Sequence, residues 1–326
     1  MIITSTPLRI SFVGGGSDMP SFFRNDRGAV LSVAIDKYVY VTVNKKFDDH
    51  IRVSYSRTEE VASVEDVEHP LVRACMTFTG ITKGVEITSI ADIPSRGTGL
   101  GSSSSFTVGL LNALYSYSGR NPTAPALGQE ACKIEIDICG APIGKQDQYA
   151  AAFGGMNVFE FSADDSVRVE PVTCARTTLT ALQGSLMLLY TGITRSAAEL
   201  LRVQIKNVED DEAQRSTMRN MVKLVDTFKS ELYAGNIDAL GEILHESWLL
   251  KRSLTSQISS EQIDNWYATA RKHGAIGGKI LGAGAGGFLL LLAPPDRHDA
   301  IKHSLPQLRS INFSFDRLGS RVIFNH

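Results

Sequence analysis

The stretch from Ser95 to Leu110, SRGTGLGSSSSFTVGL, restricts the possible folds of this chain more than any other segment. Glycines occupy every second position at Gly97, Gly99 and Gly101, four serines follow, and apolar residues then recur at helical spacing. Glycine lets backbone N–H groups converge on one point, and the positive end of a following helix strengthens their attraction for an anion. The stretch therefore predicts a loop at a helix start that binds polyphosphate.

A flexible surface turn is the alternative interpretation of residues 97–104, but such a linker does not normally lead directly into a helical apolar pattern. The loop also lacks the lysine of a P-loop, G-x-x-x-x-G-K-[ST]. Serine hydroxyls can donate to phosphate oxygens or join the oxygen shell of Mg²⁺. A nucleotide site here would thus be of another type.

Composition narrows the class of ligand. The 326 residues are 43% hydrophobic and 21% charged, which suffices for two domains. The 33 basic and 35 acidic residues form no tail or block, so we expect a small-molecule ligand and neither nucleic acid nor membrane. The start of the chain has no secretion signal, and the apolar run FLLLL is too short to cross a bilayer. Four scattered cysteines favour reduced thiols and a cytoplasmic location.

The order of predicted elements suggests two parts. Strands dominate the first 60 residues, and a further strand precedes the glycine-serine loop. A helix is expected over 127–140, and long amphipathic helices from 196 to about 254. A β-rich section with one short helix follows. The change from strand-rich to helix-rich sequence places a boundary near Thr178.

A second glycine loop, GAGAGG, contains G-x-G-x-x-G at Gly282, Gly284 and Gly287. In a dinucleotide-binding fold the third glycine opens a helix, whereas here the apolar run FLLLL predicts a buried strand. We therefore reject an NAD-dependent dehydrogenase. A backbone nest that shapes a pocket and a plain tight turn both remain open.

A third loop ends the predicted strand in PLRISFVGGGSDMP. Three glycines at 14–16 permit a ligand to approach the backbone closely, and Asp18 could hold sugar hydroxyls. Asp18 could equally cap the next helix, with Ser17 as the competing cap.

Two carboxylates on a shared segment complete the set of candidates. Glu135 lies on the expected helix, the turn GAPIG follows, and Asp147 stands at another helix start. Phosphoryl transfer needs a metal ligand and a group that orients or deprotonates the accepting hydroxyl, and these two could fill the roles. Asp137 could be the ligand instead, and all three could be surface acids.

Together, and in this order, the three loops and the acid pair resemble the GHMP small-molecule kinases, which include galactokinase, homoserine kinase and mevalonate kinase. PLRISFVGGGSD, IPSRGTGLGSSSS and KILGAGAGGF resemble the family's three motifs, and the likeness covers most of the chain. The resemblance implies an α+β fold: an N-terminal βαβ-type ATP-binding domain over 1–178 and a C-terminal ferredoxin-like domain with long helices over 179–326. The site is then expected in the cleft between them.

The resemblance also implies roles for individual residues in a direct in-line transfer from ATP. Asp147 matches the base toward the substrate hydroxyl, Arg9 matches a cation that assists it, and Ser103 and Glu135 would hold Mg²⁺. The residues expected to bind ATP are Gly97, Thr98, Gly99, Leu100, Gly101, Ser102, Ser103 and Ser104. Those expected near the acceptor are Gly15, Gly16, Ser17, Asp18, Gly282, Ala283 and Gly284.

Within the family, PLRISFVGGGSDMPSFF and YTGITRSA are similar to the D-glycero-D-manno-heptose 7-phosphate kinases, which phosphorylate the anomeric hydroxyl of an already phosphorylated sugar. Galactokinases carry a Glu-His pair where this chain has Gly15 and Gly16, which argues against galactose. A phosphorylated substrate should need a second basic pocket, and an arginine fork suits phosphate well. Arg195 and Lys145 are the first candidates for this pocket, and the reserve candidates are Arg73, Arg96 and Lys279. Any of these five could instead be a surface charge.

Two rival functions remain to be tested against this expectation. The acceptor could be fucose, an N-acetylhexosamine, galactose or mevalonate. A sensor that binds nucleotide or sugar without catalysis would lack the base or the metal ligand, yet Asp147 and Glu135 are both present. The sequence leaves open whether the chain forms a homodimer.

Overall fold

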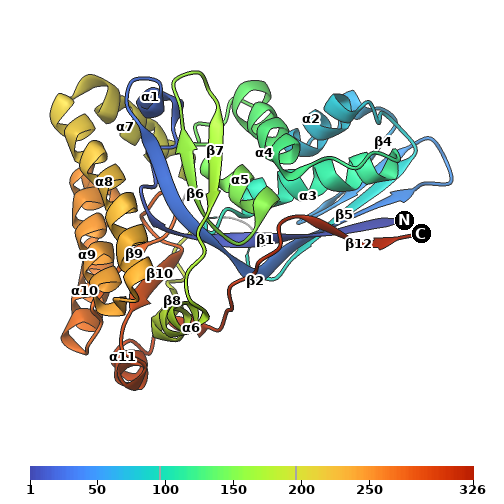
Figure 1. The fold of residues 1–326 in the computed structure, drawn as a ribbon. Helices are drawn as coiled ribbons and strands as arrows, with labels where there is room; N and C mark the ends of the chain where they lie inside the picture. Colours follow the sequence, from blue (N-terminus) through green and yellow to red (C-terminus); the bar gives the residue numbers. More distant parts are fainter. Residues whose placement is uncertain (95–96, 195–196) are drawn as a thin grey trace.

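The computed structural model describes residues 1–94, 97–194 and 197–326, and contains two β-sheets with helices packed on them (Figure 1). The larger sheet has eight strands in the order β12-β1-β2-β5-β3-β4, with β6 and β7 continuing from β2. Its strands are β1 (Ile2–Val13), β2 (Gly28–Lys45), β3 (Ile51–Ser54), β4 (Thr58–Val61), β5 (Val85–Ala91), β6 (Met156–Phe161), β7 (Val167–Pro171) and β12 (Arg321–Asn325).

The smaller sheet has four antiparallel strands in the order β11-β8-β10-β9. They are β8 (Leu186–Tyr190), β9 (Gly277–Ile280), β10 (Phe288–Leu292) and β11 (Arg309–Ile311). Strand β10 is fully buried and follows the GAGAGG loop, so the strand predicted there, which led us to reject a dinucleotide fold, is confirmed.

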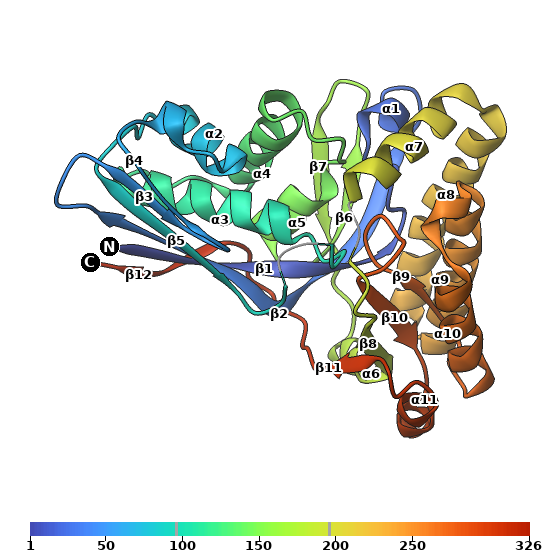
Figure 2. The same cartoon turned by 180° about the vertical axis from the view of Figure 1, so that it is seen from behind.

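Helices fall into two groups, one packed on the larger sheet and one beside the smaller sheet (Figures 1 and 2). On the larger sheet lie α2 (Pro70–Thr79), α3 (Ser102–Tyr117), α4 (Ala124–Cys132), a π-helix (Lys133–Ile138) and α5 (Gln146–Phe153), and α1 (Pro20–Phe23) follows β1. The second group is α6 (Arg176–Ser185), α7 (Ala197–Asp210), α8 (Glu212–Ala234), α9 (Ile237–Ser253), α10 (Glu261–Lys272) and α11 (His298–Ser304). Single 3₁₀ turns lie at Val64–Asp66, Ser256–Ile258 and Pro295–Arg297.

One hydrophobic core runs through both sheets and holds the two groups of helices together. Phe12 at the end of β1 stacks on Phe228 of α8, with ring centroids 5.1 Å apart. The last strand, β12, returns to pair with β1, so the two termini lie side by side (Figure 1). The second half of the chain thus contacts β1 at both ends: β12 pairs with its first residues, and Phe228 packs on Phe12 just before the glycine loop.

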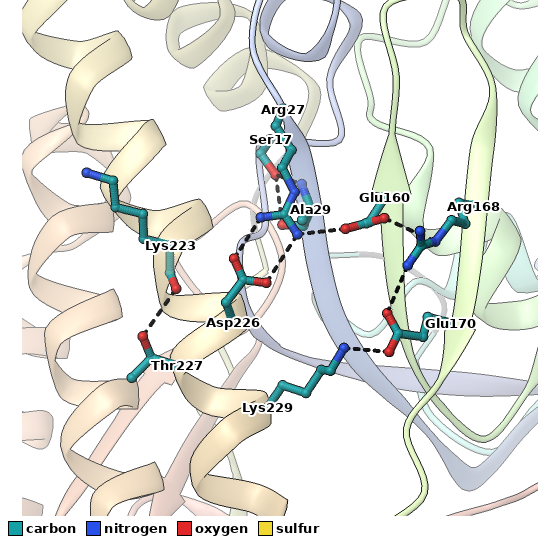
Figure 3. Close-up of polar contacts among 10 residues, drawn as sticks. All are labelled: Ser17, Arg27, Ala29, Glu160, Arg168, Glu170, Lys223, Asp226, Thr227 and Lys229. Atoms are coloured by element: carbon teal, nitrogen blue, oxygen red, sulfur yellow. Dashed lines mark hydrogen bonds and ion pairs between the residues drawn. The ribbon is translucent and has the colours of Figure 1, made fainter.

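A half-exposed ring of ion pairs also joins the larger sheet to α8 (Figure 3). Arg27, just before β2, contacts both Asp226 of α8 and Glu160 of β6. The series continues through Arg168 and Glu170 of β7 and returns to α8 at Lys229. The helix group and the sheet are thus linked at the surface as well as in the core.

Most elements lie where the sequence predicts them. The helix after the glycine-serine loop begins at Ser102, directly behind Gly101. The helix expected over 127–140 is divided into α4 and the π-helix. Helices α2 and α10 were not anticipated. In the part of the chain that the structure describes, no helix is both long and apolar enough to span a bilayer.

Candidate active site

A cavity of about 420 Å³ lies where the three glycine loops meet α5 and the ends of α9 and β9. It draws residues from both halves of the chain. Its lining includes Arg9, Ser11, Gly15, Gly16, Asp18, Gly97, Thr98, Gly99, Gly101, Ser102, Ser103, Ser104, Glu135, Gln146, Asp147, Gln204, Met218, Lys251, Lys279, Gly282 and Ala283. The sequence motifs, although separated by almost the whole chain, thus converge on one cleft.

The central and C-terminal glycine loops pack backbone against backbone. Gly99 has a φ of +75°, and a Cβ there would lie 2.3 Å from the carbonyl oxygen of Leu281. A Cβ on Gly282 would in turn lie 2.4 Å from the Cα of Gly99. No side chain fits on either side of this contact, so the GAGAGG loop supports the phosphate loop in addition to lining the cavity.

The start of α3 leaves donors available for an anion. Gly101 precedes the helix in the left-handed conformation and supplies no side-chain cap. The first N–H groups of a helix have no partner within it, and an anion is the natural ligand for them. Ser103 is exposed to the cavity, whereas Ser102 and Ser104 are buried beside it. The geometry suits a phosphate group held by backbone and hydroxyl donors without a lysine.

Arg9 of β1 and Asp147 of α5 form a buried pair next to this loop. Both Nε and Nη2 of Arg9 lie 2.7 Å from Oδ1 of Asp147, and Nη1 donates to the carbonyl oxygen of Gly99 at 2.6 Å. The arginine side chain is 4% exposed and the aspartate side chain 25%. Because Arg9 contacts only Oδ1, Oδ2 of Asp147 is left at the cavity, where it can accept a proton or a hydrogen bond from a hydroxyl.

Glu135 lies on the π-helix and is buried. Its Oε1 accepts from the hydroxyl of Ser103 at 3.0 Å, and its Oε2 accepts from Ser104 at 2.7 Å and from the amide of Gln148 at 2.6 Å. Burial raises the pKa of this carboxyl, and the three donors oppose the rise. Helices with π geometry often occur at functional sites, because the wider turn re-aims a side chain.

A magnesium ion fits the pair formed by Ser103 and Glu135. Hydroxyl and carboxylate oxygens are the hard ligands that Mg²⁺ prefers, and the ion usually takes its other ligands from phosphate and water. Among the residues described, no group of three or more His, Cys, Asp or Glu could hold a metal without such help. Asp137, the alternative ligand, is exposed and lies outside the cavity lining.

Asp18 is buried in the cavity wall and does not cap the helix that follows it. Its Oδ1 accepts from the amide of Gly16 at 2.9 Å and its Oδ2 from the amide of Gln146 at 3.2 Å. The cap position of α1 is Met19, without a side-chain hydrogen bond. Burial raises the pKa of Asp18, and the charge of Asp147 acts in the same direction. Each oxygen keeps a lone pair for a ligand hydroxyl.

Several residues predicted to bind the acceptor, and Leu100, which was predicted to bind ATP, do not line the cavity. The hydroxyl of Ser17 contacts the backbone oxygens of Gly14 and Ala29, and Gly284 packs on Ile258. Leu100 is completely buried. Lys145 pairs with Asp165 at 2.9 Å and lies over the ring of Phe23, so its ammonium is not available to a phosphate in the cavity.

The other cations predicted for the substrate phosphate, Arg195 and the three reserve residues, differ in whether they line the cavity. Arg73 is exposed and donates to the carbonyl oxygen of Val67. Arg195 and Arg96 lie outside the described residues. Lys279 lines the cavity.

Lys251, which sequence reasoning missed, also lines the cavity. It lies in the last turn of α9, where a lysine is ordinary because it favours the helix dipole, so the sequence carried no signal. Burial and, to a smaller extent, the positive charge of Arg9 lower the pKa of Lys251 to about 8, while the charge of Asp18 opposes the shift. Burial and the charge of Lys251 likewise hold the pKa of Lys279 well below its usual value.

Comparisons with known proteins identify relatives of this chain. The N-terminal domain of GHMP kinases matches residues 69–155, and their C-terminal domain matches residues 228–309. A Campylobacter jejuni protein named D-glycero-alpha-D-manno-heptose 7-phosphate kinase is 29% identical over 335 residues, covering 98% of this chain and 97% of that protein. The galactokinase of Pyrococcus furiosus is 24% identical, covering 96% and 95%.

Solved structures show the same fold. A D-glycero-D-manno-heptose 1-phosphate kinase from Bacteroides thetaiotaomicron superposes with a TM-score of 0.84, 24% identity and complete coverage of both chains. Galactokinase from Lactococcus lactis in complex with galactose has a TM-score of 0.76 and 18% identity, covering 98% of this chain and 94% of that one.

Fold and site together define an ATP-dependent kinase that acts on a small molecule. Its phosphate loop, its buried arginine-aspartate pair and its C-terminal glycine loop are built from the segments that the sequence motifs indicated. The chain belongs to the GHMP kinase family.

Proposed function

We propose that this kinase transfers the γ-phosphoryl group of ATP to the anomeric hydroxyl of D-glycero-D-manno-heptose 7-phosphate. The observation that carries the proposal is the likeness to the Campylobacter jejuni heptose 7-phosphate kinase over nearly the full length of both chains. Gly15 and Gly16 at the cavity support it, because galactokinases have two larger side chains there.

Asp147 acts on the acceptor in this proposal. Its free Oδ2 orients the anomeric hydroxyl and takes its proton as the oxygen attacks phosphorus in line. Arg9 fixes the carboxylate through Oδ1 and supplies positive charge beside the phosphoryl group. No covalent enzyme intermediate is needed.

The nucleotide binds on the other side of the phosphate loop. The backbone of residues 97–104 and the start of α3 hold the phosphates. Mg²⁺, when bound by Ser103 and Glu135, neutralises charge on the β- and γ-phosphates. A second cavity of about 530 Å³ shares Ser102 and Ser103 with the first and is lined by Tyr55, Ile90 and Phe106, which suits the adenine ring.

The acceptor lies between the two halves of the chain. Asp18 accepts hydrogen bonds from ring hydroxyls, and the backbones of Gly15, Gly16, Gly282 and Ala283 approach the sugar closely. We take residues 1–178 and 179–326 as the two domains that form this cleft, with β12 returned to the first sheet.

The test is ADP release with ATP and Mg²⁺ on a panel of acceptors: heptose 7-phosphate, mannose 6-phosphate, galactose, fucose, N-acetylglucosamine and mevalonate. We expect turnover on heptose 7-phosphate with kcat/KM at least ~100-fold above the unphosphorylated compounds, as expected when a polar group of the substrate is specifically read. Higher turnover on an unphosphorylated acceptor would leave a kinase but reject the heptose.

Asp147→Asn is the matched variant in the same assay. It should lower kcat by ~10²–10⁴-fold, the usual contribution of a positioned base, while ATP binding stays within about twofold of the wild type. Near-normal turnover would remove Asp147 from the mechanism.

A further inference from the structure

Two buried ammonium groups from the second half of the chain meet at the cavity. Lys251 of α9 is 5% exposed and Lys279 of β9 is 2% exposed. The ammonium of Lys251 donates to the carbonyl oxygen of Gly282, and that of Lys279 to the carbonyl oxygen of Phe12 at 2.9 Å. Within the described ranges, neither lysine forms an ion pair with a carboxylate.

Each of these two ammonium groups has N–H donors that no described protein atom accepts, and a positive charge that no described carboxylate pairs with. An ammonium carries three N–H donors, and each lysine uses one of them on the protein. Burying a cation without a counter-charge costs several kcal/mol unless a partner offsets it. The nearby Arg9 does not help, because it is positive and already pairs with Asp147. An anionic ligand would satisfy both requirements.

Unpartnered polar side chains point to the same conclusion independently. The hydroxyl of Ser11 and the amide nitrogen of Gln204 are buried at 4% and 5% exposure, line the cavity and have no hydrogen-bond partner among the residues that the structure describes. Buried donors without partners are rare in folded proteins and indicate a missing ligand or water. Donors thus converge from four elements: β1, α7, α9 and β9.

We propose that Lys251 and Lys279, with Ser11 and Gln204, form the subsite that binds the phosphate group of the acceptor sugar. A phosphate monoester is an acceptor-only dianion, which matches a wall of donors carrying two positive charges. Asp18, which interacts electrostatically with Lys251, would instead face the neutral ring. The assignment of the phosphate to a sugar rests on the proposed function; the anion subsite does not.

The experiment measures equilibrium binding by calorimetry to the nucleotide-free protein, with inorganic phosphate, mannose 6-phosphate and mannose as probes. Lys251→Met should weaken binding of inorganic phosphate and of mannose 6-phosphate at least ~10-fold, because a charge-assisted hydrogen bond is lost, and leave mannose unchanged. Binding of a non-hydrolysable ATP analogue should change less than about twofold. Lys272→Met, at the exposed end of α10, controls for the change in net charge.

Gln204→Leu provides a second variant that removes a donor without touching a buried charge. It should weaken phosphate binding about threefold to tenfold and keep the wild-type unfolding temperature, so the proposal stays testable if Lys251→Met does not fold.

Two results would overturn the proposal: unchanged binding of phosphate by both variants, or an ATP analogue weakened as much as mannose 6-phosphate. Loss of phosphate binding in Lys251→Met together with turnover confined to an unphosphorylated acceptor would retain the anion subsite and reject the heptose phosphate.

Discussion

At the scale of single residues, the cleft is notable for buried charges that have no full complement within the protein. Arg9 pairs with Asp147, whereas within the described part of the chain Lys251 and Lys279 donate only to backbone oxygens. Glu135 is stabilised by three neutral donors. A bound anion would bring the negative charge that Lys251 and Lys279 lack, which is the basis of the proposed anion subsite.

The lowered pKa of Lys251, about 8, predicts a pH dependence of anion binding. The charged groups around it are Arg9 on β1, Lys279 on β9 and Asp18 in the loop after β1. Lysine is positive below its pKa, so affinity for mannose 6-phosphate should be highest between about pH 6, where a phosphate monoester becomes a dianion, and pH 8. It should fall as the pH rises through about 8, by up to ~10-fold per unit.

Calorimetry from pH 6.5 to 9.5 measures this directly. Binding at pH 9 should also take up a proton, which appears as a dependence of the enthalpy on the buffer. An affinity that stays flat from pH 7 to 9.5 would show that Lys251 does not contact the anion. The exposed variant Lys272→Met should follow the wild-type profile.

What the sequence predicts about individual residues depends on whether they lie in a motif. Arg9, Asp18, Glu135 and Asp147 stand in or near recognisable segments, and the structure brings them to one cavity. Lys251 lies on an amphipathic helix whose pattern indicates only which face packs. Its burial follows from the tertiary contact with Gly282, which no local pattern contains.

At the scale of elements, the contact between two glycine loops is the feature that positions the phosphate loop. Gly99 packs on the backbone of Leu281 and Gly282, so the C-terminal glycine loop supports the loop that we propose binds the nucleotide phosphates. The two loops come from opposite halves of the chain. A substitution in either loop should therefore alter the binding of the nucleotide phosphates that we propose.

Gly99→Ala tests this contact, and Gly80→Ala is its control. Both glycines have positive φ, +75° and +79°, but a Cβ at Gly80 meets nothing within 4 Å, whereas one at Gly99 overlaps the backbone. Gly80→Ala should cost about 1–2 kcal/mol of unfolding free energy, the strain of a left-handed alanine. Gly99→Ala should cost more and weaken ATP-analogue binding at least ~10-fold.

Urea unfolding and analogue titration supply the two measurements. ATP-analogue affinities that are equal in the two variants would mean that the loops do not need their close approach for nucleotide binding.

The sequence predicted some secondary-structure elements correctly and missed others. Strand β10 and the start of α3 were located from apolar patterning and glycine placement. The division of the helix at 127–140 into α4 and a π-helix was not, because α- and π-helices share nearly the same hydrophobic spacing over so few residues. Helix α10 buries Ile263, Trp266, Tyr267 and Ala270 at spacings of three and four, a signal that was present and not used.

At the scale of the whole molecule, α8 connects the cleft to the outer face of the larger sheet. Met218 of α8 lines the cavity, Phe228 stacks on Phe12, and Asp226 and Lys229 carry the ion pairs to the sheet (Figure 3). The pairing of β12 with β1 adds a strand from the far end of the chain to the same sheet. Helix α8 is thus joined to the larger sheet both in the core and at the surface.

Arg27→Met tests the contribution of the ion pairs to this connection. Arg27 contacts Asp226 through two hydrogen bonds and Glu160 through another, but its side chain is 48% exposed. Solvent screening limits such pairs, so we expect a loss of about 1 kcal/mol in unfolding free energy at low salt, and less than half of that in ~1 M NaCl. Arg52→Met is the matched control, because Arg52 pairs only with Glu86 inside the larger sheet.

The same ion pairs determine in which direction the folding stability changes as the pH falls. The neighbouring cations lower the pKa of Asp226 and of Glu170, so the stability they contribute is present above the pKa values of the unfolded chain and is lost as the pH falls through the folded ones. The stability difference between wild type and Arg27→Met, measured by urea unfolding, should therefore shrink from pH 7 toward pH 3. A difference that stays constant over this range, or that survives high salt undiminished, would mean that Arg27 acts through the packing of its aliphatic stem and not through its charge.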